Sequence, residues 1–344
     1  MATSGLLFPG TGNELCQPGR AAATVAVMST QQNTYDVLVL GGGAAGLSAA
    51  LVLSRAQRTV AVVDAGLPRN APAARMHGFL SRDGMPPRDL PAVGRAEVAS
   101  YGGVVLPGTV AQVGRTTTGF DGLLADGTRL TARRLLVATG LVDELPDLPG
   151  VRGRFGRDVL HCPYCHGFEV RASKVGVLGG APNSFHQVQL VRQWAGDVVF
   201  FSNGSLLTVE QREQREQLVA RAIGVVDGQV TGLDVQDDRL CGVLVEGAGL
   251  VRRDAVFVAP TFVPSSNLLT ELGCQVDDNG WPLVDKTGQT TVPGVWAAGN
   301  AVNPRAQVIT AAGDGSAAAI ALNNDLVEQD VRDAVVLFRL GMPV

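Results

Sequence analysis

The chain has 344 residues, enough for about two domains of ordinary size. Its 46% hydrophobic and 17% charged residues are typical of a globular protein and exclude a disordered or fibrous one. The net charge of −4, with no concentration of basic residues, excludes a nucleic-acid footprint, so no polyanionic partner is expected. The 43 glycines gather in short runs, which indicates places where a ligand approaches the backbone.

Residues 1–33 are expected to form a disordered extension, with Met28 as an alternative start. They lack a basic stretch before an apolar core, so no secretion signal is expected and the cytoplasm is the predicted compartment. The charge-free run of residues 37–54 approaches the length of a membrane span. Three consecutive glycines divide it into a strand pattern and a helix pattern, so no membrane association is expected.

The first strong pattern is a strand, a glycine turn, a helix and a second strand. Residues 35–40 are a continuous apolar run typical of a buried parallel strand, residues 41–46 read Gly-Gly-Gly-Ala-Ala-Gly, and a helix follows up to Arg55. Residues 59–64 form the next strand and end in an acid. This order is that of a dinucleotide-binding βαβ unit.

Each glycine of this unit has a separate task. Gly41 permits the tight turn, Gly43 lets the backbone approach a pyrophosphate, and Gly46 lets helix and strand pack closely. The phosphates would lie at the helix N-terminus, whose N–H groups favour anions. Asp64 is placed to accept a hydrogen bond from a ribose hydroxyl. A tight turn without a ligand is the alternative interpretation.

A second unit of this kind is predicted further along the chain. Residues 174–179 and 197–201 have strand patterns, with a helix between them to about Trp194. Ala181 and Ser184 stand where the second and third glycines belong, and neither an acid nor an arginine follows the second strand. A retained fold with a weakened site is therefore favoured over a working nicotinamide site, and the use of NAD(P)H stays open.

Three further regions complete the predicted elements. Strands are expected within residues 131–140 and 253–261, which suit crossovers between two domains. Residues 291–300 hold a short strand that ends in Gly-Asn, and residues 307–321 form a helix rich in alanine and glycine. Such small side chains let a helix lie close to another backbone or to a flat cofactor.

Cys162 and Cys165 form a Cys-Pro-Tyr-Cys motif flanked by His161 and His166. Cysteines at this spacing can close a small disulfide ring or act as attacking and resolving thiols. A neighbouring histidine can stabilise a thiolate or carry its proton at neutral pH. The motif therefore favours a redox-active dithiol.

A zinc half-site and a c-type haem attachment site are the alternatives. Zinc would need two further ligands, but Cys241 and Cys274 stand alone, and haem would need an exported chain and an axial ligand. These two cysteines and Cys16 are interpreted as small apolar residues, and no metal is expected.

The redox interpretation leads to a flavin. Two thiols release two electrons when they form a disulfide, and an isoalloxazine can accept both and pass them to oxygen or to a nicotinamide. A glycine-fingerprint domain and a CxxC pair in one chain are the parts that such an enzyme requires. FAD is therefore the expected cofactor.

Four motifs together resemble the low-molecular-weight thioredoxin reductases: residues 41–46, the cysteine motif of residues 162–165, Pro-Gly-Val-Trp-Ala-Ala-Gly-Asn of residues 293–300, and Gln-Val-Ile-Thr-Ala-Ala-Gly of residues 307–313. The resemblance extends over nearly all of residues 34–328. It implies an α/β fold of two Rossmann-like dinucleotide-binding domains, the second inserted in the first, and a homodimer. The implied parts are an FAD-binding domain of residues 34–148 and 262–330, an inserted NAD(P)-type domain of residues 149–261 with the CxxC pair, and a C-terminal tail of residues 331–344.

The chain also departs from that family. Besides the damaged second fingerprint, His166 stands where thioredoxin reductases carry an acid after the second cysteine, and Asn300 stands where they carry an aspartate. In these respects the chain resembles the dithiol oxidases of gliotoxin and holomycin type, which close a disulfide in a small natural-product dithiol and return the electrons to O2. That activity is the expected one. The alternatives are an NADPH-dependent enzyme that reduces a protein disulfide such as that of thioredoxin, and a flavin-bound redox sensor without turnover.

The resemblance implies roles for single residues. Cys165 corresponds to the flavin-proximal thiol, which adds to the flavin ring, and Cys162 to the thiol that exchanges with the substrate. His166 is the candidate acid and base, whereas a structural role is expected for His161. Asn300 is expected to form a hydrogen bond with the ribityl chain.

Further positions are implied in binding FAD. The backbone of Gln307 and Val308 matches the stretch that faces the flavin pyrimidine, and Asn70 and His77 lie in the loop after the second strand, where the family contacts FAD. The full set of implied cofactor-binding residues is Gly41, Gly43, Ala44, Ala45, Gly46, Asp64, Asn70, His77, Gly299, Asn300, Gln307 and Val308.

Overall fold

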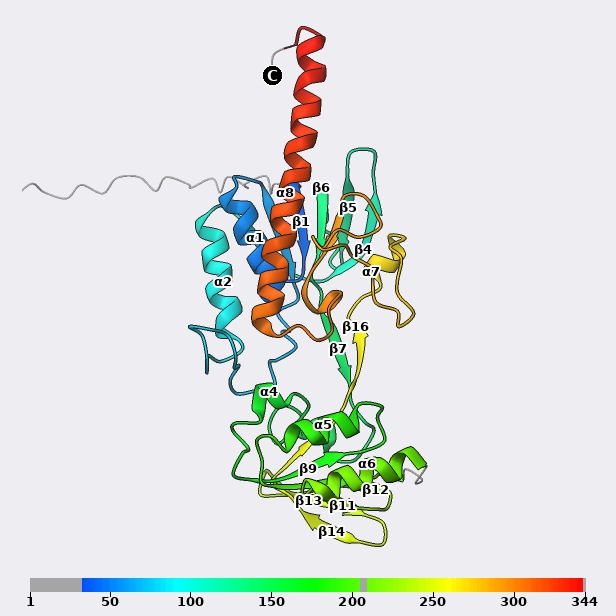
Figure 1. The fold of residues 1–344 in the computed structure, drawn as a ribbon. Helices are drawn as coiled ribbons and strands as arrows, with labels where there is room; N and C mark the ends of the chain where they lie inside the picture. Colours follow the sequence, from blue (N-terminus) through cyan, green and yellow to red (C-terminus); the bar gives the residue numbers. More distant parts are fainter. Residues whose placement is uncertain (1–32, 205–208, 343–344) are drawn as a thin grey trace, which may run out of the picture. The chain divides into compact units, whose positions relative to one another are not determined.

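The computed structural model describes residues 33–204 and 209–342 (Figure 1). Residues 1–32 of the expected extension, with Met28 and Cys16, lie outside the described residues. The predicted α/β fold is confirmed, because two separate sheets with parallel strands are each accompanied by helices.

Seven strands build the first sheet. In chain order they are β1 (Thr34–Leu40), β2 (Val60–Asp64), β3 (Val104–Pro107), β4 (Val110–Arg115), β5 (Phe120–Leu124), β6 (Arg129–Val137) and β17 (Val295–Ala297). Their order is β3-β2-β1-β6-β5-β4, with β17 also paired to β6. The pairs that involve β1, β2, β3 and β17 are parallel, whereas β4 and β5 add an antiparallel extension. Because β17 comes late in the chain, segments distant in sequence complete one sheet.

Three long helices accompany this sheet: α1 (Ala44–Arg55), α2 (Asp89–Ser100) and α8 (Val308–Arg339). Helix α1 contacts both α2 and α8 (Figure 1). The approach of α1 to α8 depends on small residues, since a Cβ added to Gly315 would lie 2.0 Å from the backbone oxygen of Ala45. The predicted helix of small residues is therefore present, and its composition serves this close contact.

Helix α8 is longer than the small-residue pattern predicts. It runs to Arg339, so residues 331–339, which the sequence placed in a C-terminal tail, continue the helix. The pattern of alanine and glycine is limited to the part of α8 that contacts α1. Beyond that part, Asp330 forms ion pairs with Arg58 and Arg133, which connect the second half of the helix to the first sheet.

The second sheet is entirely parallel. Its strands are β8 (Val159–Leu160), β9 (Lys174–Leu178), β10 (Asp197–Phe201), β11 (Gly224–Val226) and β15 (Ala255–Phe257). Their order is β11-β10-β9-β15-β8. The second βαβ unit is confirmed as β9, helix α5 (Ser184–Val191) and β10, and the helix ends slightly before the expected Trp194.

The remaining elements lie around these two sheets. Helix α6 (Val209–Ala220) connects β10 with β11, and a three-stranded antiparallel sheet follows it. Its strands are β12 (Val230–Gln236), β13 (Arg239–Val245) and β14 (Gly249–Arg252). The short helices are α3 (Val151–Arg154), α4 (Pro163–His166), α7 (Leu268–Glu271) and the 3-10 turn η1 (Gly299–Ala301).

Two short antiparallel strands, β7 (Leu141–Glu144) and β16 (Thr261–Pro264), carry the chain between the two sheets. They follow the crossovers expected within residues 131–140 and 253–261. In their register Asp143 lies opposite Phe262. Each sheet has its own buried apolar clusters, so the ribbon of β7 and β16 joins two separately packed parts.

The apolar run of residues 37–54 divides into β1, the glycine turn and α1, as the glycines predict. Within residues 33–204 and 209–342, no helix has the length and apolar character that crossing a membrane requires. The same part of the chain contains no group of three or more side chains that could hold a metal ion.

Candidate active site

The predicted cysteine pair is a disulfide. Cys162 and Cys165 are bonded to each other, and their Cα atoms lie 5.3 Å apart. Pro163 starts helix α4 directly after Cys162, and its fixed φ suits this first helical position. One short turn thus brings residues three apart together. Cys162 is buried, with 8% of its surface exposed, and Cys165 is more exposed.

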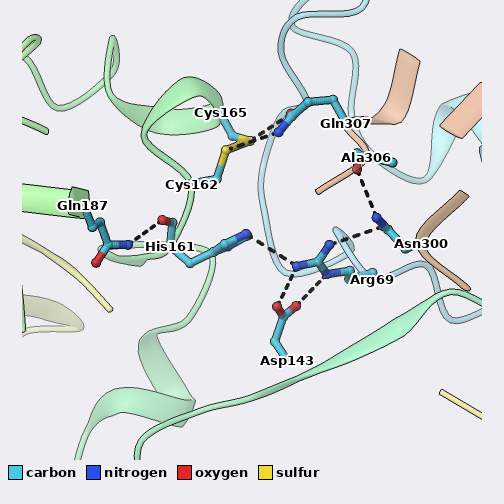
Figure 2. Close-up of a disulfide and its surroundings, with 9 residues drawn as sticks. All are labelled: Arg69, Asp143, His161, Cys162, Cys165, Gln187, Asn300, Ala306 and Gln307. Atoms are coloured by element: carbon cyan, nitrogen blue, oxygen red, sulfur yellow. Dashed lines mark hydrogen bonds and ion pairs between the residues drawn. A yellow bond between two sulfur atoms is a disulfide. The ribbon is translucent and has the colours of Figure 1, made fainter. Parts of the chain in front are cut away.

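The side chain of Gln307 contacts both sulfurs (Figure 2). Its Oε1 lies 3.2 Å from Sγ of Cys165, and its Nε2 lies 3.6 Å from Sγ of Cys162. When the disulfide is reduced, the Cys165 thiol faces an acceptor and the Cys162 sulfur faces a donor. The sequence predicted a backbone role for Gln307 and Val308, so this side-chain contact was missed. Val308 is the first residue of α8.

The ring nitrogens of His166, which follows Cys165, have no hydrogen-bond partner in the part of the chain that the structure describes. Both of its ring nitrogens are buried. Burial lowers the pKa of His166, because the imidazolium loses its hydration, while nearby Glu169 opposes this shift and His77 adds to it. The ring is therefore neutral at pH 7 and free to accept a proton, which fits the predicted acid and base.

The side chain of His77 contacts two carboxylates, one in its own loop and one near the cysteine pair. Its Nδ1 lies 3.2 Å from Oδ2 of Asp83, and its Nε2 lies 3.5 Å from Oε1 of Glu169. Glu169 is three residues beyond His166 in sequence. The predicted FAD-contacting loop therefore connects with the segment that carries the cysteine pair.

Arg69 is a functional candidate that the sequence did not indicate. It donates two hydrogen bonds to Asp143, of 2.8 Å from Nε and 2.7 Å from Nη2, and one of 3.3 Å from Nη1 to Oδ1 of Asn300. Its Nη2 also lies 3.5 Å from Nε2 of His161 (Figure 2). The neighbouring Asn70 was predicted instead, and its carbonyl accepts from the N–H of Ala73.

His161 is held in a tight apolar setting. Its ring stacks on Phe155 and meets the edge of Phe262, with centroid distances of 6.0 Å in both cases. Burial lowers the pKa of His161 to about 4, with Asp143 opposing and Arg69 adding to the shift. The neutral Nε2 can therefore accept from Arg69, and these contacts fit the structural role expected for His161.

Asn300 shapes the turn before α8. Its Oδ1 faces Arg69, and its Nδ2 donates to the carbonyls of Asn303, at 2.9 Å, and Ala306, at 3.1 Å. Because Ala306 precedes Gln307, these bonds define the backbone that presents Gln307 to the disulfide. The ribityl contact predicted for Asn300 stays a prediction.

The first glycine turn has the geometry of a phosphate cradle. Gly41 has a φ of +104°, and a Cβ there would lie 2.4 Å from the oxygen of Ala138. A Cβ on Gly46 would lie 1.8 Å from the oxygen of Gly41. At Gly43 the same test finds no atom within 4 Å, so this backbone is open. The turn is thus closed on the protein side and open on the ligand side.

The surroundings of this turn leave donors for a ligand. No side chain caps α1, which starts at Ala44 after Gly43. Asp64 accepts from the N–H of Gly42 at 3.3 Å. Gly299 has a φ of +65°, and a Cβ there would lie 2.9 Å from Cβ of Ala45, which packs η1 against α1. These features fit a dinucleotide pyrophosphate at α1.

The second turn differs in its polar groups. The N–H of Ala181 donates to Oγ of Ser184 at 3.1 Å, and this hydroxyl donates to the carbonyl of Ala181 at 2.8 Å. Ser184 is only 1% exposed. After β10, Oδ1 of Asn203 accepts from the N–H of Val230 at 3.0 Å. A backbone donor of the fingerprint is therefore already satisfied by the protein.

The chain matches known proteins over most of its length. The sequence profile of the pyridine nucleotide-disulphide oxidoreductases matches residues 35–315. The chain belongs to this family. It is an FAD-dependent oxidoreductase, and the glycine turn at α1 fits the pyrophosphate of that cofactor.

Relatives cover nearly the whole described chain. Thioredoxin reductase aclD of Aspergillus oryzae is 30% identical over 311 residues, which are 85% of this chain and 96% of that protein. Thioredoxin reductase sirT of Leptosphaeria maculans is 28% identical over 321 residues, covering 88% and 98%. The crystal structure of HlmI has 52% sequence identity and a TM-score of 0.85, and it covers 89% of this chain and 96% of that one. The predicted resemblance to thioredoxin reductase-like enzymes is confirmed.

Proposed function

We propose that this FAD-dependent enzyme is a dithiol oxidase, which converts a small dithiol and O2 into a cyclic disulfide and hydrogen peroxide. The observation that carries the proposal is the second turn, where the buried Ser184 hydroxyl occupies the N–H of Ala181. In addition, residues 202–204, which directly follow β10, contain neither an acid for a ribose hydroxyl nor an arginine for the 2′-phosphate of NADPH. The electrons therefore enter from thiols rather than from a nicotinamide.

Thiol exchange at the cysteine pair supplies the chemistry. A substrate thiolate attacks one sulfur of the Cys162–Cys165 disulfide and displaces the other as a thiolate. The second substrate thiol then breaks the mixed disulfide, so the substrate is oxidised and the cysteine pair gains two electrons. FAD, held at the glycine turn before α1, would supply the two-electron acceptor for the cysteine pair, and O2 would finally take the two electrons with two protons to give hydrogen peroxide.

Two residues support this exchange. The neutral imidazole of His166 can take the proton of an attacking thiol, because its nitrogens have no other partner among the described residues. The amide of Gln307 offers a donor and an acceptor to the two sulfurs. The proposal retains Cys165 as the flavin-proximal thiol and Cys162 as the thiol that exchanges with the substrate.

The proposal also assigns the cofactor and the assembly. FAD is assigned to a domain of residues 34–148 and 262–330, and the cysteine pair to an inserted domain of residues 149–261. A homodimer and a cytoplasmic location complete the proposal. Support for the split domain comes from β17, which pairs directly with β6. All strands of the second sheet lie between these two strands in sequence.

A thioredoxin reductase-type reaction, from NADPH through FAD to a protein disulfide, is the second candidate. The names of the curated relatives favour it. So do two exposed aromatic side chains next to the disulfide, Tyr164 at 68% and Phe168 at 62%, which a protein partner could cover.

Anaerobic stopped-flow spectroscopy separates the two candidates. The FAD-loaded protein is mixed with dithiothreitol or with micromolar NADPH, and the flavin absorbance is followed. The oxidase predicts rapid bleaching by dithiothreitol and none by NADPH, followed by stoichiometric peroxide after O2 is admitted. Rapid bleaching by NADPH without any thiol would rule the oxidase out in favour of the reductase.

A further inference from the structure

We propose that Arg69 is a positioning residue for thiol exchange, which holds the segment with Cys162 and the segment with Gln307 in place on the two sides of the disulfide. This role rests on the dithiol oxidase proposed above. Arg69 itself touches neither sulfur among its described contacts. It acts through His161 on one side and through Asn300 on the other (Figure 2).

On the cysteine side, Arg69 reaches the residue directly before Cys162. Its Nη2 lies 3.5 Å from Nε2 of His161. The carbonyl of His161 accepts from Nε2 of Gln187 at 2.7 Å, so the ring and the backbone of His161 are both held. A fixed His161 limits the positions that the Cys162 sulfur can adopt.

On the glutamine side, Arg69 reaches the turn directly before Gln307. Its Nη1 donates to Oδ1 of Asn300 at 3.3 Å. The Nδ2 group of Asn300 then donates to the carbonyls of Asn303 and Ala306. The orientation of the Asn300 amide thus connects Arg69 with the backbone that carries the Gln307 side chain.

Arg69 can hold both sides because it is itself anchored on the β7–β16 ribbon. Its paired bonds to Asp143 bury that carboxylate to 7% exposure. Its guanidinium also lies over the ring of Phe262, 4.9 Å from the centroid, and Phe262 is opposite Asp143 in the ribbon. The acid and the aromatic face fix the guanidinium plane.

Only a guanidinium can make this set of contacts. Asp143, Asn300 and His161 lie in three directions, and Arg69 faces them with Nε, Nη1 and Nη2. A lysine ammonium is a single charged point and cannot span the same partners. Lysine at this position should therefore keep the pairing with Asp143 but lose the connection between the two sides of the disulfide.

The expected consequence is kinetic. A misplacement of about 1 Å between reacting groups can lower a rate about 100-fold without changing which groups are present. Loss of Arg69 should therefore lower the limiting rate of exchange, whereas the dithiol concentration at half saturation should change little. A residue with only a structural role would instead alter FAD content or unfolding.

The test uses the FAD-loaded holoenzyme and dithiothreitol as the probe, under anaerobic conditions. In Arg69→Met and Arg69→Lys, the limiting rate of flavin bleaching should fall about 10- to 100-fold, with half saturation shifted by less than about 3-fold. The matched control is Arg88→Met. Arg88 is exposed at the start of α2 and has no hydrogen bond or ion pair within residues 33–204 and 209–342. This control should behave like the wild type.

A second readout does not depend on turnover. The reduced protein is treated with iodoacetamide, and peptide mass spectrometry gives the alkylation rates of Cys162 and Cys165 separately. In the wild type the two rates should differ, because Cys162 is a buried residue and Cys165 is more exposed. If the Arg69 variants hold the segments with Cys162 and Gln307 less firmly, the alkylation rates of Cys162 and Cys165 should become more similar. In the Arg88 control the two rates should differ as much as in the wild type.

The outcomes distinguish this inference from the proposed function. If the FAD-loaded Arg69 variants bleach within about 2-fold of the wild-type rate and keep its alkylation ratio, Arg69 is not a positioning residue, although the oxidase stands. If the wild type itself is not bleached by dithiothreitol, the oxidase fails, and the alkylation ratio still tests Arg69. Should Arg69→Met not fold, Arg69→Lys carries the same test.

Discussion

The two strand-turn-helix units share a backbone plan but differ in what their turns offer to a ligand. In the first turn, Gly43 leaves the start of α1 open, since no protein atom lies within 4 Å of its Cβ position. In the second, the hydroxyl of Ser184 bonds the N–H and the carbonyl of Ala181. A Rossmann-like unit therefore forms whether or not the N–H groups of its turn are free, because strand pairing and helix packing do not use those groups.

The largest effect is expected at the cysteine pair, which is where the proposed oxidase takes up electrons. Cys162→Ser and Cys165→Ser should each lower dithiol-dependent oxygen uptake at least about 1,000-fold, because exchange needs both sulfurs. Both variants should stay yellow, since the proposed FAD site is the first turn and not the cysteine pair. An oxygen electrode measures the rate. Uptake that survives in the double variant would show a second electron route.

The next test blocks the first turn alone. Gly43→Val should weaken FAD binding about 100-fold, because the new side chain occupies the place of the pyrophosphate. The fold should persist, since Gly43 has a φ of −79° and its Cβ position is free of protein atoms within 4 Å. Fluorescence titration of the apoprotein measures the affinity. The matched change in the second turn, Ala181→Val, should leave FAD affinity unchanged; an equal loss in both would contradict the contrast.

A smaller effect is expected from His166, the proposed proton acceptor beside the cysteine pair. His166→Asn should lower kcat/KM for dithiothreitol about 10- to 50-fold near pH 7. Because burial places the pKa of His166 below its usual 6.5, the ratio of the wild-type rate to the His166→Asn rate should decline only as the pH falls below 6.5. A rate profile from pH 5 to 8 checks this. Ionisation of dithiothreitol affects both proteins equally. If the rate of the variant declines at low pH in the same way as the wild-type rate, His166 is not the proton acceptor.

The smallest effect concerns the second turn. Ser184→Ala should lower the free energy of unfolding by about 1–2 kcal/mol, because the N–H of Ala181 loses its partner and the buried hydroxyl of Ser184 is removed. Bleaching by dithiothreitol should not change, and NADPH should still cause none. Urea denaturation measures the stability. Ser100→Ala is the matched control, since Ser100 also donates to a carbonyl three residues earlier but is exposed.

The local elements of the first unit were predictable to within a residue or two. The apolar run of residues 35–40 became β1, the glycines became the turn, and residues 59–64 became β2. The cysteine pair was equally readable, because residues three apart at a proline-initiated turn come together whatever surrounds them. The length of α8 was less predictable from the sequence. Its second half is connected to the rest of the fold by ion pairs of Asp330 with Arg58 and Arg133, which are distant in sequence.

The amino-acid order alone therefore decided the two βαβ units, the dithiol chemistry and the flavin, because each depends on neighbours close in sequence. Only the folded chain decided what surrounds the disulfide. Arg69 meets a carboxylate 74 residues away and an amide 231 residues away, and Gln307 meets Cys165 across 142 residues. Such contacts leave no periodic trace in a sequence, since they arise where loops from separately packed parts converge.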